Sequence, residues 1–212
     1  MEGVTMSNTF PDTQKSIRSA GMKEFLEKGF KDASLREIAA AAGVTTGAIY
    51  GYYRDKCMLF SDLVEPMAEE FAARFKAAQS AFGNFEPQQQ IKTMLAYSAE
   101  ELRQMLDYVY QNFEVFRLLL CCSAGTRYEH YLDEMVELDA RSTLLFMNVL
   151  KDNGYQPASL KPNLVHILSN AYLSAIFEIV NHNMDKAEAD EYAEHITAFF
   201  AAGWNALLKF QD

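Results

Sequence analysis

The sequence has few cysteines and lacks any long uncharged apolar run. Its 212 residues include three cysteines, an odd number, and two of these, Cys121 and Cys122, are adjacent. Adjacent cysteines make a poor pair for an ordinary disulfide, so we expect reduced, buried thiols. The longest apolar candidate, residues 116–122, contains Arg117 and is far shorter than the ~18 residues of a membrane span. These absences predict a soluble protein with no disulfide framework and no membrane partner.

Signals for secretion, metal binding and catalysis are lacking as well. The N-terminal residues show no basic cluster followed by an apolar stretch, which predicts a cytoplasmic location. The four histidines, at positions 130, 166, 182 and 195, have no HxxxH spacing, and the cysteines form no CxxC pair. No Ser/His/Asp or Cys/His pattern supports an enzyme. We therefore expect no catalytic residue, no metal and no cofactor.

The composition is that of a folded chain, with 50% hydrophobic and only 23% charged residues. The formal net charge is -10, which argues against a nucleic-acid partner for the chain as a whole. The charge is unevenly distributed, however, because residues 1–56 carry a net +1 and residues 57–212 carry -11. Only the N-terminal quarter is therefore suited to an anionic partner.

Apolar residues recur at the helical period throughout, and no segment alternates as a strand does. The sequence therefore predicts an all-α fold of about nine helices. Ser34 and Glu37 form an S-x-x-E pattern that predicts a capping box, and Thr126 with Glu129 predicts a second one. Pro162 suits the first turn of a helix that runs through Asn181.

Two short predicted helices, joined at residues 43–45, have the layout of a helix-turn-helix. Gly43 permits a left-handed turn residue, and Ala39 and Val44 are small enough for a close helix crossing. Such a unit presents the start of its second helix to base edges in the major groove of DNA. Any all-α protein can also contain a helical hairpin of this kind, so the spacing alone leaves both interpretations open.

Residues 30–60, FKDASLREIAAAAGVTTGAIYGYYRDKCMLF, favour the DNA-binding interpretation, because this segment resembles the DNA-binding domain of the TetR family of bacterial transcriptional regulators. The resemblance covers about a quarter of the chain. It rests on Ile17, Ala20, Phe25, Gly29, Phe30, Ile38, Ala39, Ala42, Gly43, Val44, Gly47, Tyr50, Tyr52, Lys56, Leu59 and Phe60. It implies an N-terminal arm and DNA-binding domain over residues 1–55, and a ligand-binding and dimerisation domain over residues 56–212.

The resemblance also implies roles for individual residues. Tyr50, Tyr52 and Lys56 are similar to residues that contact DNA phosphates. Thr45, Thr46, Gly47 and Ala48 are the predicted base-facing residues. Ser34 and Arg36 are predicted to contact the flanking DNA backbone, and they complete the predicted DNA-binding set. Core packing is the alternative role for Tyr52 and its neighbour Tyr53, and a solvated surface position is the alternative for Lys56.

Three positions depart from the family pattern. Gly51 stands where a larger polar residue is common, which removes a possible DNA contact and weakens the helix by about 1 kcal/mol. Gly21 and Glu24 stand where Ala and a large apolar residue are preferred, which predicts looser packing of the first helix. With little hydrogen-bonding capacity at Gly47 and Ala48, sequence preference would depend more on DNA shape.

The central helices are rich in methionine and aromatic residues, which suit an adaptable ligand pocket, although an ordinary helical core explains most of them equally well. The predicted ligand-binding residues are Met67, Phe71, Met94, Tyr97, Tyr108, Phe113, Phe116, Arg117, Tyr131, Met135 and Tyr172. The last two helices carry broad apolar faces, which predict a homodimer. The predicted interface residues are Leu164, Leu168, Ala171, Ala175, Phe199, Phe200, Gly203, Trp204 and Leu207.

These features together predict a homodimeric regulator, most often a repressor in this family, that a small, largely apolar or aromatic molecule releases from a near-palindromic stretch of double-stranded operator DNA. The alternative is a helical interaction protein of the same fold that has lost specific DNA binding. Gly51 and the sparse base-facing side chains favour that alternative, and the ordered motif across the N-terminal helices favours the regulator.

Overall fold

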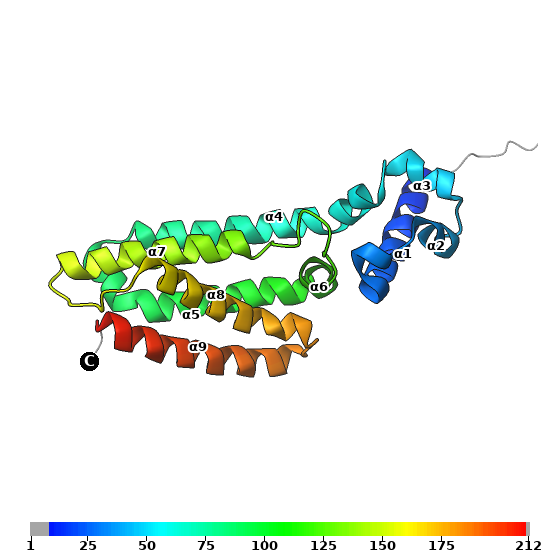
Figure 1. Ribbon diagram of the computed structural model, residues 1–212. Coiled ribbons are helices and arrows are strands. Elements are labelled where there is room, and N and C mark those ends of the chain that lie inside the picture. Colours follow the sequence, from blue (N-terminus) through cyan, green and yellow to red (C-terminus); the bar gives the residue numbers. More distant parts are fainter. Residues whose placement is uncertain (1–8, 211–212) are drawn as a thin grey trace, which may run out of the picture. The chain divides into compact units, whose positions relative to one another are not determined.

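The computed structural model describes residues 9–210, and within that range it contains nine helices and no strand. The predicted all-α fold is therefore confirmed. The first part of the predicted N-terminal arm, residues 1–8, lies outside the described residues. Figure 1 labels the helices, which are α1 (Thr9–Asp32), α2 (Leu35–Ala41), α3 (Thr46–Tyr52), α4 (Lys56–Gly83), α5 (Pro87–Gln111), α6 (Phe113–Cys121), α7 (Asp133–Asp152), α8 (Pro162–Asn181) and α9 (Lys186–Leu208).

The chain forms two compact units. The N-terminal unit holds the residues up to Ala68 together with Glu114–Glu129, and the bundle unit holds Glu69–Phe113 and the residues from His130 onward. The boundary at residues 55 and 56 stays a prediction, and these units divide the chain differently. The start of α4 belongs to the N-terminal unit because Leu59, Phe60 and Leu63 are buried there.

Three phenylalanines centre the N-terminal unit. The ring of Phe60, on α4, meets those of Phe25 and Phe30 edge-on, at centroid distances of 5.2 and 5.4 Å. A Cβ atom at Gly21 would lie 3.1 Å from Leu59 Cδ2, so glycine allows α4 to pack closely on α1. The expectation that Gly21 loosens the packing of α1 stays a prediction.

Glu24 also has a structural role, and it replaces the predicted capping box at the start of α2. The backbone N–H of Ser34 donates to Glu24 Oε1 at 3.1 Å, while the Ser34 side chain makes no capping hydrogen bond. The carboxylate of Glu37 pairs with Lys28 instead of turning back to Ser34. The reciprocal capping box was therefore a wrong prediction. Glu24 of α1 accepts from the Ser34 N–H, and Lys28 of α1 pairs with the Glu37 carboxylate.

The second predicted capping box is also wrong, because α7 begins at Asp133 and not near Thr126. The Thr126 hydroxyl donates to the Ser123 carbonyl at 2.7 Å and accepts from the Tyr128 N–H, and Glu129 accepts from the Gly125 N–H at 2.9 Å. These bonds close a series of turns before the helix. The same residue types therefore stabilise a loop here.

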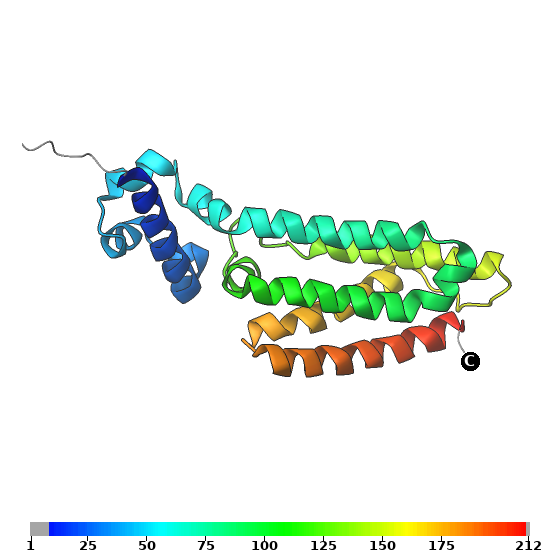
Figure 2. The same ribbon diagram turned by 180° about the vertical axis from the view of Figure 1, so that it is seen from behind.

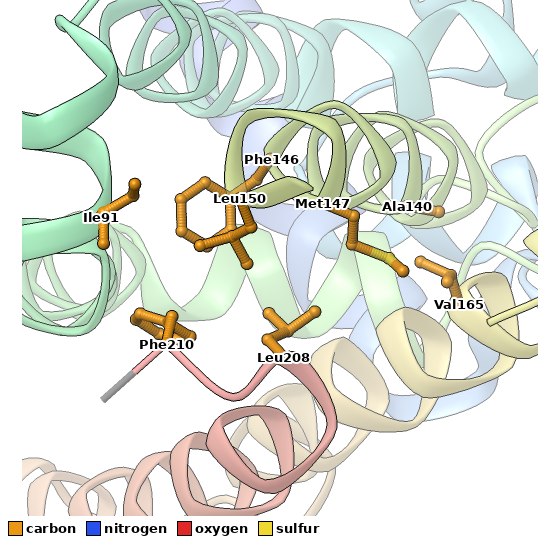
Figure 3. Packing of buried hydrophobic residues seen from close by; sticks show 8 residues of the cluster. All are labelled: Ile91, Ala140, Phe146, Met147, Leu150, Val165, Leu208 and Phe210. Atoms are coloured by element: carbon orange, nitrogen blue, oxygen red, sulfur yellow. The ribbon is translucent and has the colours of Figure 1, made fainter. Parts of the chain in front are cut away.

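The bundle unit packs its helices lengthwise, and α5, α7, α8 and α9 lie side by side in both Figure 1 and Figure 2. Figure 3 shows how a buried cluster joins several of these helices at one end of the bundle. Phe210, beyond the end of α9, folds back so that its ring meets Phe146 edge-on at 5.5 Å. The cluster consists of Ile91, Ala140, Phe146, Met147, Leu150, Val165, Leu208 and Phe210.

Among residues 9–210, α8 alone is long and apolar enough to span a membrane by composition, with a mean hydropathy of 1.3. Its inner side is part of the bundle core, where Val165, Leu173, Ile176 and Val180 are buried. Core helices of globular proteins pass the same test, so α8 gives only weak support for a membrane span.

Candidate functional site

The α2–turn–α3 segment forms a helix-turn-helix in the N-terminal unit. Gly43 has a φ of +68°, a left-handed conformation that glycine adopts without strain. The Val44 N–H then donates to the Ala39 carbonyl at 3.0 Å, which closes the end of α2. Ile38 and Ile49 are fully buried, so the inner faces of both helices are fixed. The predicted helix-turn-helix is present in the structure.

The outer face of α3 is open to solvent. The Thr45 hydroxyl caps the helix by accepting from the Ala48 N–H at 3.2 Å, and Gly47 next to it is exposed. Tyr50 is 57% exposed. Thr46 and Ala48 are partly buried. The predicted base-facing residues thus lie at the accessible end of a helix whose opposite side is anchored.

The tyrosines that follow Tyr50 differ from each other in burial. Tyr53 is only 4% exposed, and its hydroxyl donates to Asp62 Oδ2 at 2.6 Å. Burial first, and then the carboxylate of Asp62, raise the pKa of Tyr53, while Arg18 pairs with the same carboxylate. Tyr53 therefore packs in the core, as the alternative interpretation proposed, and Tyr52 remains partly exposed.

Lys56 has a partner that the sequence did not indicate. Its ammonium donates to the carbonyls of Lys31 at 3.0 Å and Ala33 at 2.9 Å, and it lies 4.6 Å from the centroid of the Phe30 ring. These contacts tie the start of α4 to the C-terminal end of α1. Lys56 is therefore not a freely solvated lysine, and a phosphate contact by its remaining N–H stays a prediction.

Two arginines near the helix-turn-helix are exposed. Arg36, on α2, belongs to the predicted DNA-binding set, whereas Ser34 beside it is partly buried and its N–H is held by Glu24. Arg54, two residues after the end of α3, has an 85% exposed side chain that lies 3.3 Å from the Asp55 carboxylate. Arg54 was not among the predicted DNA-binding residues, although a cation that follows the second helix of a helix-turn-helix is a signal that the sequence contains.

The bundle unit contains a cavity of about 170 Å³. Five of the predicted ligand-binding residues line it: Phe71, Met94, Tyr97, Met135 and Tyr172. Several of its polar lining residues were not predicted, including Gln79, Glu101, Asp139 and Thr143. Asp139 has a signal in the sequence, because Met135, Asp139 and Phe146 are spaced to share one face of α7.

Six predicted ligand-binding residues do not line this cavity. Phe116 and Arg117 belong to the N-terminal unit, where Phe116 is fully buried and Arg117 lies 3.5 Å from Glu114. The ring of Phe113 stacks on Tyr110 at 5.0 Å, and Tyr108 lies under the guanidinium of Arg74. The remaining two also lie outside the lining: Met67 and Tyr131.

The predicted interface residues fall into two groups. On the outside of α8 and α9, Leu164 is 42% exposed and Phe199 is 72% exposed, and Ala171 and Gly203 are exposed as well. The remaining outer members are partly buried: Leu168, Ala175 and Leu207.

Phe200 and Trp204 turn inward and line the cavity. The ring of Phe200 lies 5.1 Å from that of Tyr172. Successive helical positions point about 100° apart, so Phe199 and Phe200 face different surroundings. The assignment of Phe200 and Trp204 to the subunit interface stays a prediction, and the structure places both at the cavity.

The cysteines differ from the expected buried thiols. Cys57 and Cys121 are exposed, and Cys122 is partly buried, where burial raises its pKa and Arg117 lowers it to a smaller extent. Between residues 9 and 210, no three His, Cys, Asp or Glu side chains gather as metal ligands would.

The comparisons with known proteins agree on the N-terminal segment. Residues 17–63 match the family described as bacterial regulatory proteins, tetR family. Over 54 residues, the chain is 44% identical to the HTH-type transcriptional regulator AcrR of Shigella flexneri, which covers 26% of this chain and 25% of that protein. It is 42% identical over 53 residues to the HTH-type transcriptional repressor BepR of Brucella suis biovar 1, or 25% of each chain. The chain thus matches about a quarter of the length of these curated relatives.

A solved structure extends the likeness to the rest of the fold. A TetR-family transcriptional regulator from Bordetella parapertussis superposes with a TM-score of 0.58 over 88% of this chain and 93% of that one. The sequence identity is 15%, so this likeness concerns the fold alone. The helix-turn-helix and the match over residues 17–63 support membership of the tetR family of bacterial regulatory proteins, and this match covers the N-terminal part of the chain.

Proposed function

We propose that this protein is a cytoplasmic transcriptional repressor that binds operator DNA as a homodimer and is released by a small molecule. The observation that carries the proposal is the open face of α3, on which Tyr50 is 57% exposed while Ile49 beside it is fully buried. This face lies within residues 17–63, where the matched relatives are a transcriptional regulator and a transcriptional repressor.

Two DNA-binding domains related by a twofold axis require a near-palindromic operator. Its half-sites would lie one helical turn of DNA, roughly 34 Å, or a multiple of that distance apart. Phosphate contacts would supply most of the affinity, because Gly47 and Ala48 offer few groups to base edges. We assign these contacts to Arg36 and Arg54, whose side chains are exposed. Sequence preference would then depend largely on the fit and deformability of the DNA.

Release would follow from a population shift. The ligand would bind more tightly to the conformation in which the spacing of the two DNA-binding domains does not match the operator. Two helices provide continuous routes for this coupling. Phe71 of α4 lines the cavity and Phe60 of the same helix packs in the N-terminal core. The second route is α5, which lines the cavity and leads into the segment Glu114–Glu129 of the N-terminal unit.

That segment is firmly held in the N-terminal unit. The Phe30 N–H donates to the Cys122 carbonyl at 2.9 Å, and the ring of Tyr128 lies 6.2 Å from that of Phe60. Arg127 pairs with Glu65. A ligand that moves the end of α5 would therefore act on residues that contact α1 and α4 directly.

The test is capture of fragmented genomic DNA by the purified, full-length protein, followed by sequencing. We expect enrichment of a near-palindrome by the wild type and its loss in Thr46→Ala/Tyr50→Ala, a variant that changes only the outer part of α3. Arg141→Ala, an exposed change in the bundle unit, serves as the control and should leave the enrichment intact. A folded wild-type protein that enriches no sequence would favour the alternative, an interaction protein of the same fold.

A further inference from the structure

The cavity of the bundle unit is one-sided in charge. Two carboxylates line it, Asp139 from α7 and Glu101 from α5. Among its described lining residues there is no lysine, arginine or histidine. Buried or partly buried carboxylates are normally paired with a cation, because an unpaired charge in a low-dielectric setting is costly. The cavity therefore has two carboxyl groups and no cationic partner for either of them among its described lining residues.

Asp139 has a neutral hydrogen-bond partner and no cationic one among the described residues. The Gln79 side-chain N–H donates to Asp139 Oδ1 at 3.3 Å, which is a neutral partner. Burial raises the pKa of Asp139, and the nearby Ser169 hydroxyl and the Gln79 amide lower it to a smaller extent. Between residues 9 and 210, no cationic side chain forms an ion pair with Asp139. The electrostatic effect of the carboxylate extends to Tyr172, whose pKa is raised by burial first and by Asp139 as well.

The remaining walls of the cavity also favour a cation. Aromatic rings carry negative charge density on their faces and attract ammonium groups that have lost their water. Methionine thioethers add a polarisable apolar surface, which Met94, Met105 and Met135 supply here. Rings from five different helices take part, among them Phe71, Tyr97, Phe146, Tyr172 and Trp204.

We propose that the cavity binds a small lipophilic ammonium ion, with the cationic nitrogen beside Asp139 and the apolar part against the aromatic rings. The proposal rests on the proposed function, in which this cavity is the effector site. A volume of about 170 Å³ limits the ligand to a small molecule. A carboxylic acid would bring a like charge toward Asp139 and Glu101, and a neutral ligand would leave Asp139 without its missing partner.

The experiment compares three probes of nearly the same outline and different charge: phenyltrimethylammonium, tert-butylbenzene and benzenesulfonate. Affinities are measured by calorimetry on the full-length protein without DNA. The chain has a single tryptophan, Trp204, and it lines the cavity, so its fluorescence reports where the probe binds. We expect the cation to bind about tenfold or more tightly than the neutral probe, with a change in Trp204 emission, and the anion not to bind.

Asp139→Asn tests the role of the carboxylate while it keeps the shape of the side chain. We expect this variant to lose about tenfold or more in affinity for phenyltrimethylammonium and to keep its affinity for tert-butylbenzene. The matched control is Glu137→Gln, which makes the same charge change on the same helix, at an exposed residue outside the cavity lining. It should bind all three probes as the wild type does.

Several results would overturn the proposal: tighter binding of the neutral or anionic probe, no binding of any probe, or an unchanged cation affinity in Asp139→Asn. These results leave the DNA-capture experiment unaffected, because it requires no ligand. If an operator is enriched but the cation does not bind, the proposed ligand class is rejected and the proposal of a repressor is kept. If the cation binds but no DNA is enriched, the proposed ligand site is kept and the proposal of a repressor is rejected.

Discussion

Single residues affect the stability of the helix-turn-helix in this chain, and Gly51 is the clearest example. It is exposed on α3, and apart from its chain neighbours and the nearby backbone of its own helix no atom lies within 4 Å of the place where a Cβ would stand. We expect Gly51→Ala to raise the free energy of unfolding by about 1 kcal/mol, since glycine is the weaker helix former. Chemical denaturation measures this difference. Ala40→Gly, at an exposed position of α2, should show the opposite sign, and a destabilised Gly51→Ala would mean that α3 requires glycine there.

Lys56 connects two helices through its ammonium, so its truncation affects folding as well as DNA binding. We expect Lys56→Ala to lower the free energy of unfolding by about 1–2 kcal/mol, because two carbonyls lose a charged donor. If the remaining N–H contacts a phosphate, the slope of log affinity against log salt also falls by about one per site. Lys15→Ala, an exposed change on α1, controls for the loss of charge. Unchanged stability would contradict the contacts to Lys31 and Ala33.

Asp139 should make the stability of the protein depend on pH. Because burial raises its pKa in the folded state, the folded protein holds this proton more tightly than the unfolded chain does. Stability is therefore lost as the pH rises from the ordinary carboxyl value of about 3.9 through the raised value, by about 1.4 kcal/mol for each pKa unit between the states. Asp139→Asn should be more stable than the wild type at pH 7 and equal to it near pH 3, by thermal unfolding. A difference that persists at pH 3 would contradict this account.

At the scale of elements, α8 shows what local sequence signals can predict. Pro162 opens this helix and Asn181 ends it, as predicted, because proline at the first turn costs no hydrogen bond. Thr126 and Glu129 show the limit, since the same S/T-x-x-E pattern stabilises turns here and α7 starts later. Which of two local hydrogen-bonding arrangements forms depends on residues far away in the sequence.

The candidate sites follow the same rule. The helix-turn-helix was predictable because all its determinants lie within a short, continuous segment. The cavity was predictable only in part, since its lining comes from α4, α5, α7, α8 and α9. Phe116 was assigned to it because it is large and apolar, but its helix packs in the other unit. The phase of α9, which separates Phe199 from Phe200, also requires the tertiary structure.

At the scale of the whole molecule, the exposed apolar residues of α8 and α9 predict the dimer. Phe199 is 72% exposed and Leu145, on α7, is 67% exposed, but only Phe199 belongs to the predicted interface. We expect Phe199→Ser to weaken dimerisation by about tenfold or more, because large aromatic side chains dominate interface energies. Leu145→Ser should leave the dimer intact. Light scattering across a concentration series measures both variants, and a reversed result would place the interface on α7.

The central claim is that the outer face of α3 reads DNA, and a binding isotherm tests it most directly. The captured operator and a scrambled duplex of equal length and composition are titrated at the same physiological salt concentration, with the wild type and with Tyr50→Ala. The account predicts that the wild type prefers the operator by about 10³ or more, and that Tyr50→Ala, with an unchanged helical spectrum, loses most of its operator affinity. Equal binding of both duplexes by the wild type, or full operator affinity in Tyr50→Ala, would contradict it.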